Sequence, residues 1–154
     1  PLIQSDFSRI MSLKDGKRKM SKSEVSDLSR INLTDNKDSI VNKIKKAKTD
    51  PLPLPSDLKD LEQRPEAKNL IGIYSSLTNS SLEKVIKIFE GKNFSDFKDN
   101  LSEVLIEKIE PISKEINKLM NEKDFLDKIL LEGCKKANNI ASDKVKKMQE
   151  IIGF

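Results

Sequence analysis

The chain has 154 residues, of which 36% are hydrophobic, 35% are charged and 5% are aromatic, and its formal net charge at pH 7 is +4. With five glycines, no histidine and one cysteine, the sequence excludes a turn-rich all-β fold, a disulfide framework and the usual zinc sites. No stretch is long and apolar enough to span a membrane, so we expect no membrane partner.

The positive charge is concentrated in the first third of the chain. Residues 1–50 hold 12 Lys or Arg against 7 Asp or Glu, whereas residues 51–154 hold 17 against 18. A positive field of this kind attracts anionic ligands. The asymmetry therefore favours a phosphate-bearing substrate over a general coating of nucleic acid.

The front of the chain, residues 1–30, is predicted to be a strand followed by a loop. The extended apolar part is at residues 9–13, and the basic run after it contains Gly16, which we expect to let the loop turn and move. Two ammonium groups three residues apart, set among small hydroxyl groups, suit the bridging of a polyphosphate. They belong to one pentapeptide: Lys19, Met20, Ser21, Lys22 and Ser23.

A helix is predicted over residues 34–48, with Thr34 or Asp35 as its N-cap. Its apolar residues fall on one face, namely Ile40, Val41, Ile44 and Ala47. Its lysines lie mostly off that face, namely Lys43, Lys45, Lys46 and Lys48. The proline-rich residues 51–55 end the helix and form a stiff extended connector or, alternatively, a ligand for a proline-recognising partner.

Residues 56–154 are predicted to be helices separated by short caps. Pro65 suits the first turn of one helix. Ser80 and Glu83 have the spacing of a capping box that opens the next helix, and Gly91 ends it.

Two longer helices follow. Ser95 is predicted to cap the first, and Pro111 should kink it rather than end it, because the apolar stripe resumes at once. The second begins near Asp124, and we expect Cys134 to be buried with its apolar stripe: Leu126, Ile129, Leu130, Ala137, Ile140, Ala141, Val145, Met148 and Ile152. The predicted fold class is mainly α, a helical bundle preceded by a short extended segment and the basic loop.

Strand, mobile basic loop and helix is the order in which class I aminoacyl-tRNA synthetases carry their second ATP signature, KMSKS. The whole chain resembles the C-terminal part of the tryptophanyl-tRNA synthetase family, in motifs that follow one order. Beyond the pentapeptide they are Ser-Arg-Ile-Asn-Leu-Thr-Asp at 29–35, Lys-Ile to Ala-Lys-Thr-Asp at 43–50, Arg-Pro-Glu-Ala to Asn-Leu at 64–70, Phe-Ser-Asp-Phe-Lys at 94–98 and Ile-Gly-Phe at 152–154. The tyrosyl enzymes are the nearest relatives of that family, so a tyrosyl-tRNA synthetase fragment is the alternative.

The resemblance implies that residues 1–33 end a nucleotide-binding domain and carry the KMSKS loop. Residues 34–154 would be a C-terminal helical tRNA-binding domain of anticodon-binding type. Lys19 and Lys22 would be catalytic, with Lys22 aimed at the pyrophosphate. The ATP-binding residues would be Ile10, through a backbone contact to adenine, and Lys19, Met20, Ser21, Lys22 and Ser23. No metal ligand is expected in this chain.

The implied enzyme activates L-tryptophan with ATP and Mg²⁺, releases pyrophosphate and transfers the amino acid to tRNA(Trp) in the cytoplasm. The chain begins at Pro1 and has no histidine, so the HIGH signature and the tryptophan pocket would precede it. We therefore expect this chain alone to be inactive, and the enzyme to be a homodimer through the absent catalytic half. A non-enzymatic helical module that binds RNA or protein is the competing interpretation from another class.

Overall fold

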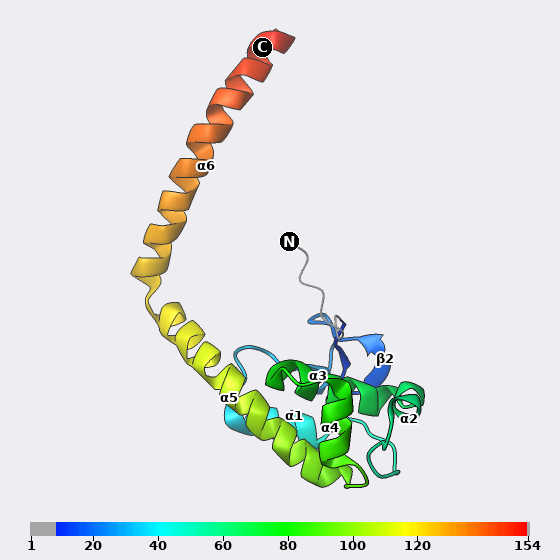
Figure 1. Ribbon diagram of the computed structural model, residues 1–154. Helices are drawn as coiled ribbons and strands as arrows, with labels where there is room; N and C mark the ends of the chain where they lie inside the picture. The colour runs from blue at the N-terminus through cyan, green and yellow to red at the C-terminus, as the bar shows by residue number, and fades with distance from the viewer. Residues whose placement is uncertain (1–8, 154) are drawn as a thin grey trace. The chain divides into compact units, whose positions relative to one another are not determined.

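The structure is a computed structural model that describes residues 9–153, and Figure 1 shows its elements along the chain. Residues 1–8 of the predicted front segment, and Phe154 at the end of the predicted helical domain, lie outside the described residues. Within the described part, a two-stranded sheet precedes six α-helices, which confirms a mainly α fold. The chain divides into two compact units between Ser113 and Lys114.

The first unit begins with an antiparallel hairpin of β1 (Met11–Ser12) and β2 (Asp15–Lys19), whose register is irregular. The prediction of a loop from residue 14 onward is wrong for β2. The charged sequence Asp-Gly-Lys-Arg-Lys lacks the alternation of apolar and polar residues by which strands are recognised. Strand pairing, which is not a property of the segment alone, makes it extended.

Helix α1 (Lys37–Lys45) confirms the predicted helix, although it is shorter than expected. Its N-cap is Asn36, whose side-chain oxygen accepts a hydrogen bond at 2.8 Å from the amide of the third helical residue. The predicted caps, Thr34 and Asp35, are wrong. Thr34 lies in the preceding turn, and the Asp35 carboxylate binds a buried lysine instead.

That lysine is Lys43, which is buried although periodicity places it off the apolar face. Its Nζ lies 2.6 Å from a carboxylate oxygen of Asp35 and 2.6 Å from one of Asp27, in the 3₁₀ turn η1 (Asp27–Ser29). A buried charge is costly unless it is paired. The two carboxylates explain why a lysine occupies this position, and both come from residues that precede the helix.

The proline-rich residues 51–55 are non-helical, as predicted, and their last two residues belong to the core. Leu54 and Pro55 are buried, and the Leu54 N–H donates to the carbonyl of Lys92 at 2.9 Å. The segment is therefore more than a spacer. It leads into helix α2 (Leu58–Gln63).

Helix α3 (Pro65–Thr78) has Pro65 at its first turn, as predicted. Helix α4 (Leu82–Phe89) is capped by Ser81, so the predicted cap at Ser80 is wrong by one residue. Gly91 has a φ of 69°, a left-handed conformation that favours glycine, and the stop predicted there is confirmed.

Helix α5 (Phe94–Asn121) continues through Pro111, so the proline does not end the helix, as predicted. The predicted cap at Ser95 is wrong because Asn93 takes that role. The Asn93 side-chain oxygen accepts the Asp96 N–H at 2.9 Å, and Ser95 already lies inside the helix.

The core of the first unit surrounds three aromatic rings, those of Tyr74, Phe89 and Phe97, with centroids 4.9–5.7 Å apart. The rings come from α3, α4 and α5. The hairpin joins this core through Leu13, which is 2% exposed, and β2 packs against α3, as Figure 1 shows. The aliphatic part of the core includes Ile40, Ile44, Leu54, Leu61, Leu70, Ile71, Val85 and Leu101.

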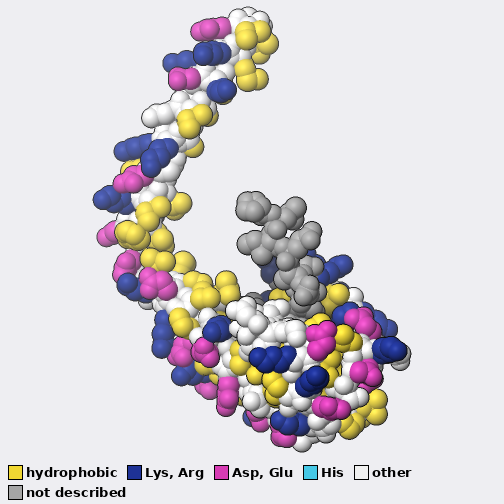
Figure 2. All heavy atoms as spheres, viewed as in Figure 1, with side chains coloured by type: hydrophobic (Ala, Val, Ile, Leu, Met, Phe, Trp, Pro, Cys, Tyr) yellow, Lys and Arg dark blue, Asp and Glu magenta, His cyan; other side chains and the backbone are white. Residues whose placement is uncertain are grey.

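The second unit contains the end of α5 and helix α6 (Lys123–Ile152). The helix begins near Asp124, as predicted, but none of its described side chains is buried, and Figure 2 shows hydrophobic groups exposed along it. The predictions of an inward apolar stripe in a bundle and of a buried Cys134 are therefore wrong. Periodicity identifies an apolar face without identifying what covers it. No helix in residues 9–153 is long and apolar enough to cross a membrane.

Candidate phosphate-binding loop

The two signature lysines lie where β2 ends and the next turn begins. Lys19 is the last residue of β2, Lys22 lies in the turn, and both side chains are exposed. Neither ammonium group forms an ion pair with a carboxylate in residues 9–153. Within the described residues, the loop thus presents two positive charges that are free to bind an anion, and charge-assisted hydrogen bonds from ammonium groups to phosphate oxygens are among the strong ones.

The turn between the lysines is closed by its own serine. The Ser21 hydroxyl oxygen accepts the Ser23 N–H at 3.2 Å, and the Ser21 carbonyl accepts the Glu24 N–H at 3.4 Å. The hydroxyl hydrogen of Ser21 is not used in either bond and can be donated to a ligand oxygen. Met20 is half-buried and packs against the core, so it anchors the turn to the core. Its neighbours Lys19 and Ser21 are exposed to solvent.

Ile10 lies beside this turn although it precedes it by a whole hairpin. The Ile10 carbonyl accepts the Met20 N–H at 3.1 Å, and its side chain is 44% exposed. The structure therefore brings all six predicted site residues into one exposed region at the open end of the hairpin.

Sequence reasoning missed two residues that hold this region in place, Asn69 and Arg30. The Asn69 side chain accepts the Met11 N–H and donates to the Met11 carbonyl, both at 2.8 Å. Arg30 Nη1 donates to the Glu24 carbonyl at 2.9 Å, just after the signature. The available signal was the polar residue Asn69 beside the apolar Leu70 and Ile71 in α3.

Gly16 is required for a close approach between β2 and α3, and the prediction that it gives the loop freedom is wrong. A Cβ at this position would lie 2.5 Å from the Pro65 carbonyl carbon and 2.6 Å from the Glu66 nitrogen. These are backbone atoms, which cannot move aside as a flexible side chain could. Only glycine lets the hairpin lie against the first turn of α3.

Gly16→Ala is expected to lift the hairpin from α3 and to cost about 1–3 kcal/mol, as overpacking does in a filled interior. Hydrogen exchange of the β1 and β2 amides in the intact protein measures this loss. Gly133→Ala is the control, because a Cβ at Gly133 meets nothing within 4 Å. Unchanged exchange of the hairpin amides in Gly16→Ala would contradict the close packing.

A salt bridge joins the first turn of α3 to the chain beyond α1. Lys48 Nζ lies 2.9 Å from a Glu66 carboxylate oxygen, and their side chains are 61% and 15% exposed. The hydrogen bond from Lys48 lowers the pKa of Glu66, with a smaller contribution from the Gly16 amide, and the same bond raises the pKa of Lys48. The pair therefore supports the surface on which the hairpin rests.

The contribution of this pair should depend on pH in a definite window. Because the folded pKa of Glu66 is lowered, the stabilisation is present above the ordinary value of 4.5 and is lost as the pH falls through the lowered value. Because the folded pKa of Lys48 is raised, it is present below 10.5 and is lost as the pH rises through the raised value. We expect Glu66→Gln to speed exchange of the hairpin amides at pH 7, with the difference from wild type vanishing at the acid end. A difference that does not depend on pH would refute this role.

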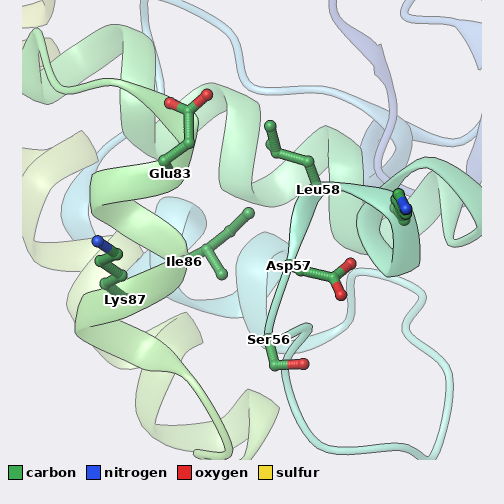
Figure 3. Close-up of a pocket in the computed structure, with 7 residues that line it drawn as sticks. Ser56, Asp57, Leu58, Glu83, Ile86 and Lys87 are labelled. Carbon is green, nitrogen blue, oxygen red and sulfur yellow. The ribbon is translucent and has the colours of Figure 1, made fainter.

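One pocket in the described part of the chain lies away from the signature, between the start of α2 and α4, and has a volume of about 420 Å³. Figure 3 shows Leu58 and Ile86 on facing sides of it. The predicted ATP-binding residues do not line it. In residues 9–153 there is no group of three or more His, Cys, Asp or Glu side chains that could hold a metal ion. The exposed basic turn is therefore the candidate site.

The hairpin, the basic turn and the helices that follow it match one class of proteins. A profile described as tRNA synthetases class I (W and Y) matches residues 2–110, which is more than half of the chain. The chain belongs to this family of class I tRNA synthetases.

Relatives of this chain are named tryptophan–tRNA ligases, which belong to the tryptophan branch of the family. The chain is 48% identical over 154 residues to a tryptophan–tRNA ligase of Mesorhizobium japonicum, covering 100% of this chain and 43% of that protein. It is 50% identical over 153 residues to one of Rickettsia felis, covering 99% of this chain and 46% of that protein. The chain thus spans less than half the length of these relatives.

Solved structures agree with the fold. A tryptophanyl-tRNA synthetase of Campylobacter jejuni, complexed with ADP and tryptophan, matches with a TM-score of 0.76 at 25% identity and covers 98% of this chain and 45% of that chain. One from Mycoplasma pneumoniae matches with a TM-score of 0.72 at 25% identity, over 98% of this chain and 45% of that chain.

Proposed function

We propose that this chain is the C-terminal portion of a tryptophan–tRNA ligase. Three observations support this proposal: the family match, the names of the relatives, and the fact that the chain spans less than half of each relative's length. In this proposal residues 1–33 end the nucleotide-binding domain and residues 34–154 form the helical tRNA-binding domain. The whole enzyme activates L-tryptophan with ATP and transfers it to tRNA(Trp).

The observation that carries the proposal is a turn, anchored at both ends, whose two ammonium groups form no ion pair within residues 9–153. When the carboxylate of the amino acid attacks the α-phosphate, negative charge builds on the departing pyrophosphate. Lys19 and Lys22 would neutralise that charge, and fixed positive groups of this kind stabilise a transition state. Ser21 and Ser23 would hold phosphate oxygens, and the Ile10 backbone would contact adenine.

The remaining partners follow from the same reading. Mg²⁺ would arrive with ATP as part of the substrate, since phosphate oxygens are ligands that it prefers. The helical part would dock the anticodon of tRNA(Trp), with lysines on phosphates and planar groups on unpaired bases. The enzyme would work in the cytoplasm as a homodimer through the catalytic half, and this chain alone would not activate tryptophan.

Amino-acid-dependent pyrophosphate exchange by the intact protein tests the proposal. We expect exchange of labelled pyrophosphate into ATP with L-tryptophan and none above background with L-tyrosine. Exchange with tyrosine alone would identify a tyrosyl enzyme. Absence of exchange with both, in a protein that still binds tRNA, would favour the non-enzymatic helical module.

A further inference from the structure

The Asn69 side chain occupies an unusual place for a polar group. It is 2% exposed and lies on α3 beside Leu70 and Ile71, which are each 1% exposed. Burying an amide is unfavourable unless its hydrogen bonds are made. Both of its bonds go to a single residue, Met11, which lies 58 positions earlier in the sequence. Within the core, the main contribution of Asn69 is therefore to hold strand β1 in place through Met11.

The two bonds hold both backbone polar groups of Met11 in β1. The Asn69 oxygen accepts the Met11 N–H and its nitrogen donates to the Met11 carbonyl, both at 2.8 Å. Two neighbouring strand residues can exchange the same pair of N–H and C=O hydrogen bonds. The side-chain amide of Asn69 therefore binds the edge of β1 as a residue of a paired strand would. A turned or shifted β1 would lose both bonds, because the donor and acceptor would no longer face their counterparts.

The fixed peptide leads directly to the candidate site. The peptide group between Ile10 and Met11 presents its N–H to Asn69 and its carbonyl to the Met20 N–H, which is 3.1 Å away. One peptide plane thus connects α3, the residue assigned to adenine and the middle of the signature. A tilt of that plane would move both ends of the ATP site at once.

We propose that Asn69 is a positioning residue for the ATP site, which holds β1 so that Ile10 and the signature lysines face the same nucleotide. This inference depends on the proposed function, in which Lys22 stabilises the departing pyrophosphate. Asn69 does not touch the reacting atoms. It acts through the peptide group that it binds, and small misplacements of reacting groups are known to cost about 10²-fold in rate.

A double-mutant cycle in the intact enzyme tests this role, with tryptophan-dependent pyrophosphate exchange as the readout. Asn69→Ala alone should lower kcat about 10- to 100-fold. In the Lys22→Ala background the same change should lower kcat by a smaller factor than it does in the presence of Lys22, because one of the two charges that Asn69 positions is already absent. Asn100→Ala, which removes only a bond within α5, is the matched control and should change little.

Native-state hydrogen exchange of Asn69→Ala guards against a folding defect. The Met11 amide, which loses its acceptor, should exchange much faster than in wild type, whereas amides in the middle of α3 should stay within about tenfold of wild type. Equal losses from Asn69→Ala with and without Lys22 would show a merely structural role and overturn the inference alone. Full activity of Asn69→Ala would overturn it too. Full activity of Lys22→Ala would instead refute the proposed function, and the inference with it.

Discussion

Replacing Lys22 with alanine in the intact enzyme is expected to lower kcat for tryptophan activation about 10²–10³-fold, the loss typical of removing one preorganised charge donor. The KM for ATP should rise much less. Under the proposed function, Mg²⁺ bound with ATP would already neutralise part of the ground-state triphosphate, whereas the charge that develops as pyrophosphate departs would need a new partner. Steady-state pyrophosphate exchange measures both constants.

Lys17→Ala is the matched control for this experiment. Lys17 is an exposed lysine on β2, two residues before Lys19, so its loss removes the same charge close to the signature without changing the signature itself. We expect kcat to stay within about twofold, since a surface charge at this distance is screened by salt. Equal losses from Lys17→Ala and Lys22→Ala would mean that bulk charge, rather than position, is what the site uses.

Of the stability changes predicted for this chain, that of Lys43→Met should be the largest, and it should appear as a lower free energy of unfolding. The methionine keeps the apolar stem but removes the ammonium group that binds Asp35, whose side chain is 9% exposed. Leaving one partner of a buried pair unpaired costs about 3–5 kcal/mol. Native-state hydrogen exchange of the α1 amides in the intact protein should speed up at least 100-fold.

Two further variants separate charge loss from a general defect in α1. Lys45→Met changes an exposed lysine in the same helix and should leave exchange nearly unchanged. Lys43→Met combined with Asp35→Asn should recover part of the stability, because a neutral amide is cheaper to bury than a lone carboxylate. If Lys43→Met exchanged like wild type, the buried ion pair would contribute nothing to α1.

The structural features that could be predicted correctly from the sequence depend on single residues and their immediate neighbours. Pro65, Gly91 and the passage of a helix through Pro111 follow from the conformations that single residues allow. The cap positions were wrong by one or two residues because Asn, Ser, Thr and Asp compete for the same role. At the start of α1, Asn36 takes it since Asp35 is bound to Lys43.

The same distinction between local and long-range features applies to the candidate site. The lysines and serines of the predicted site could be named from the chemistry of their side chains, and Ile10 could be named from the family resemblance, which implies a backbone contact. The groups that hold them could not, because the contacts join distant parts of the chain. Asn69 binds Met11 across 58 positions, and Gly16 meets the backbone of Pro65 and Glu66. Neither contact leaves a periodic signal in the sequence.

The most direct test is a structure of the intact protein with a non-hydrolysable ATP analogue and tryptophan. We expect the Nζ atoms of Lys19 and Lys22 to lie about 2.7–2.9 Å from oxygens of the β- and γ-phosphates, the range of a charge-assisted hydrogen bond. A bound nucleotide with both ammonium groups turned into solvent would contradict the account.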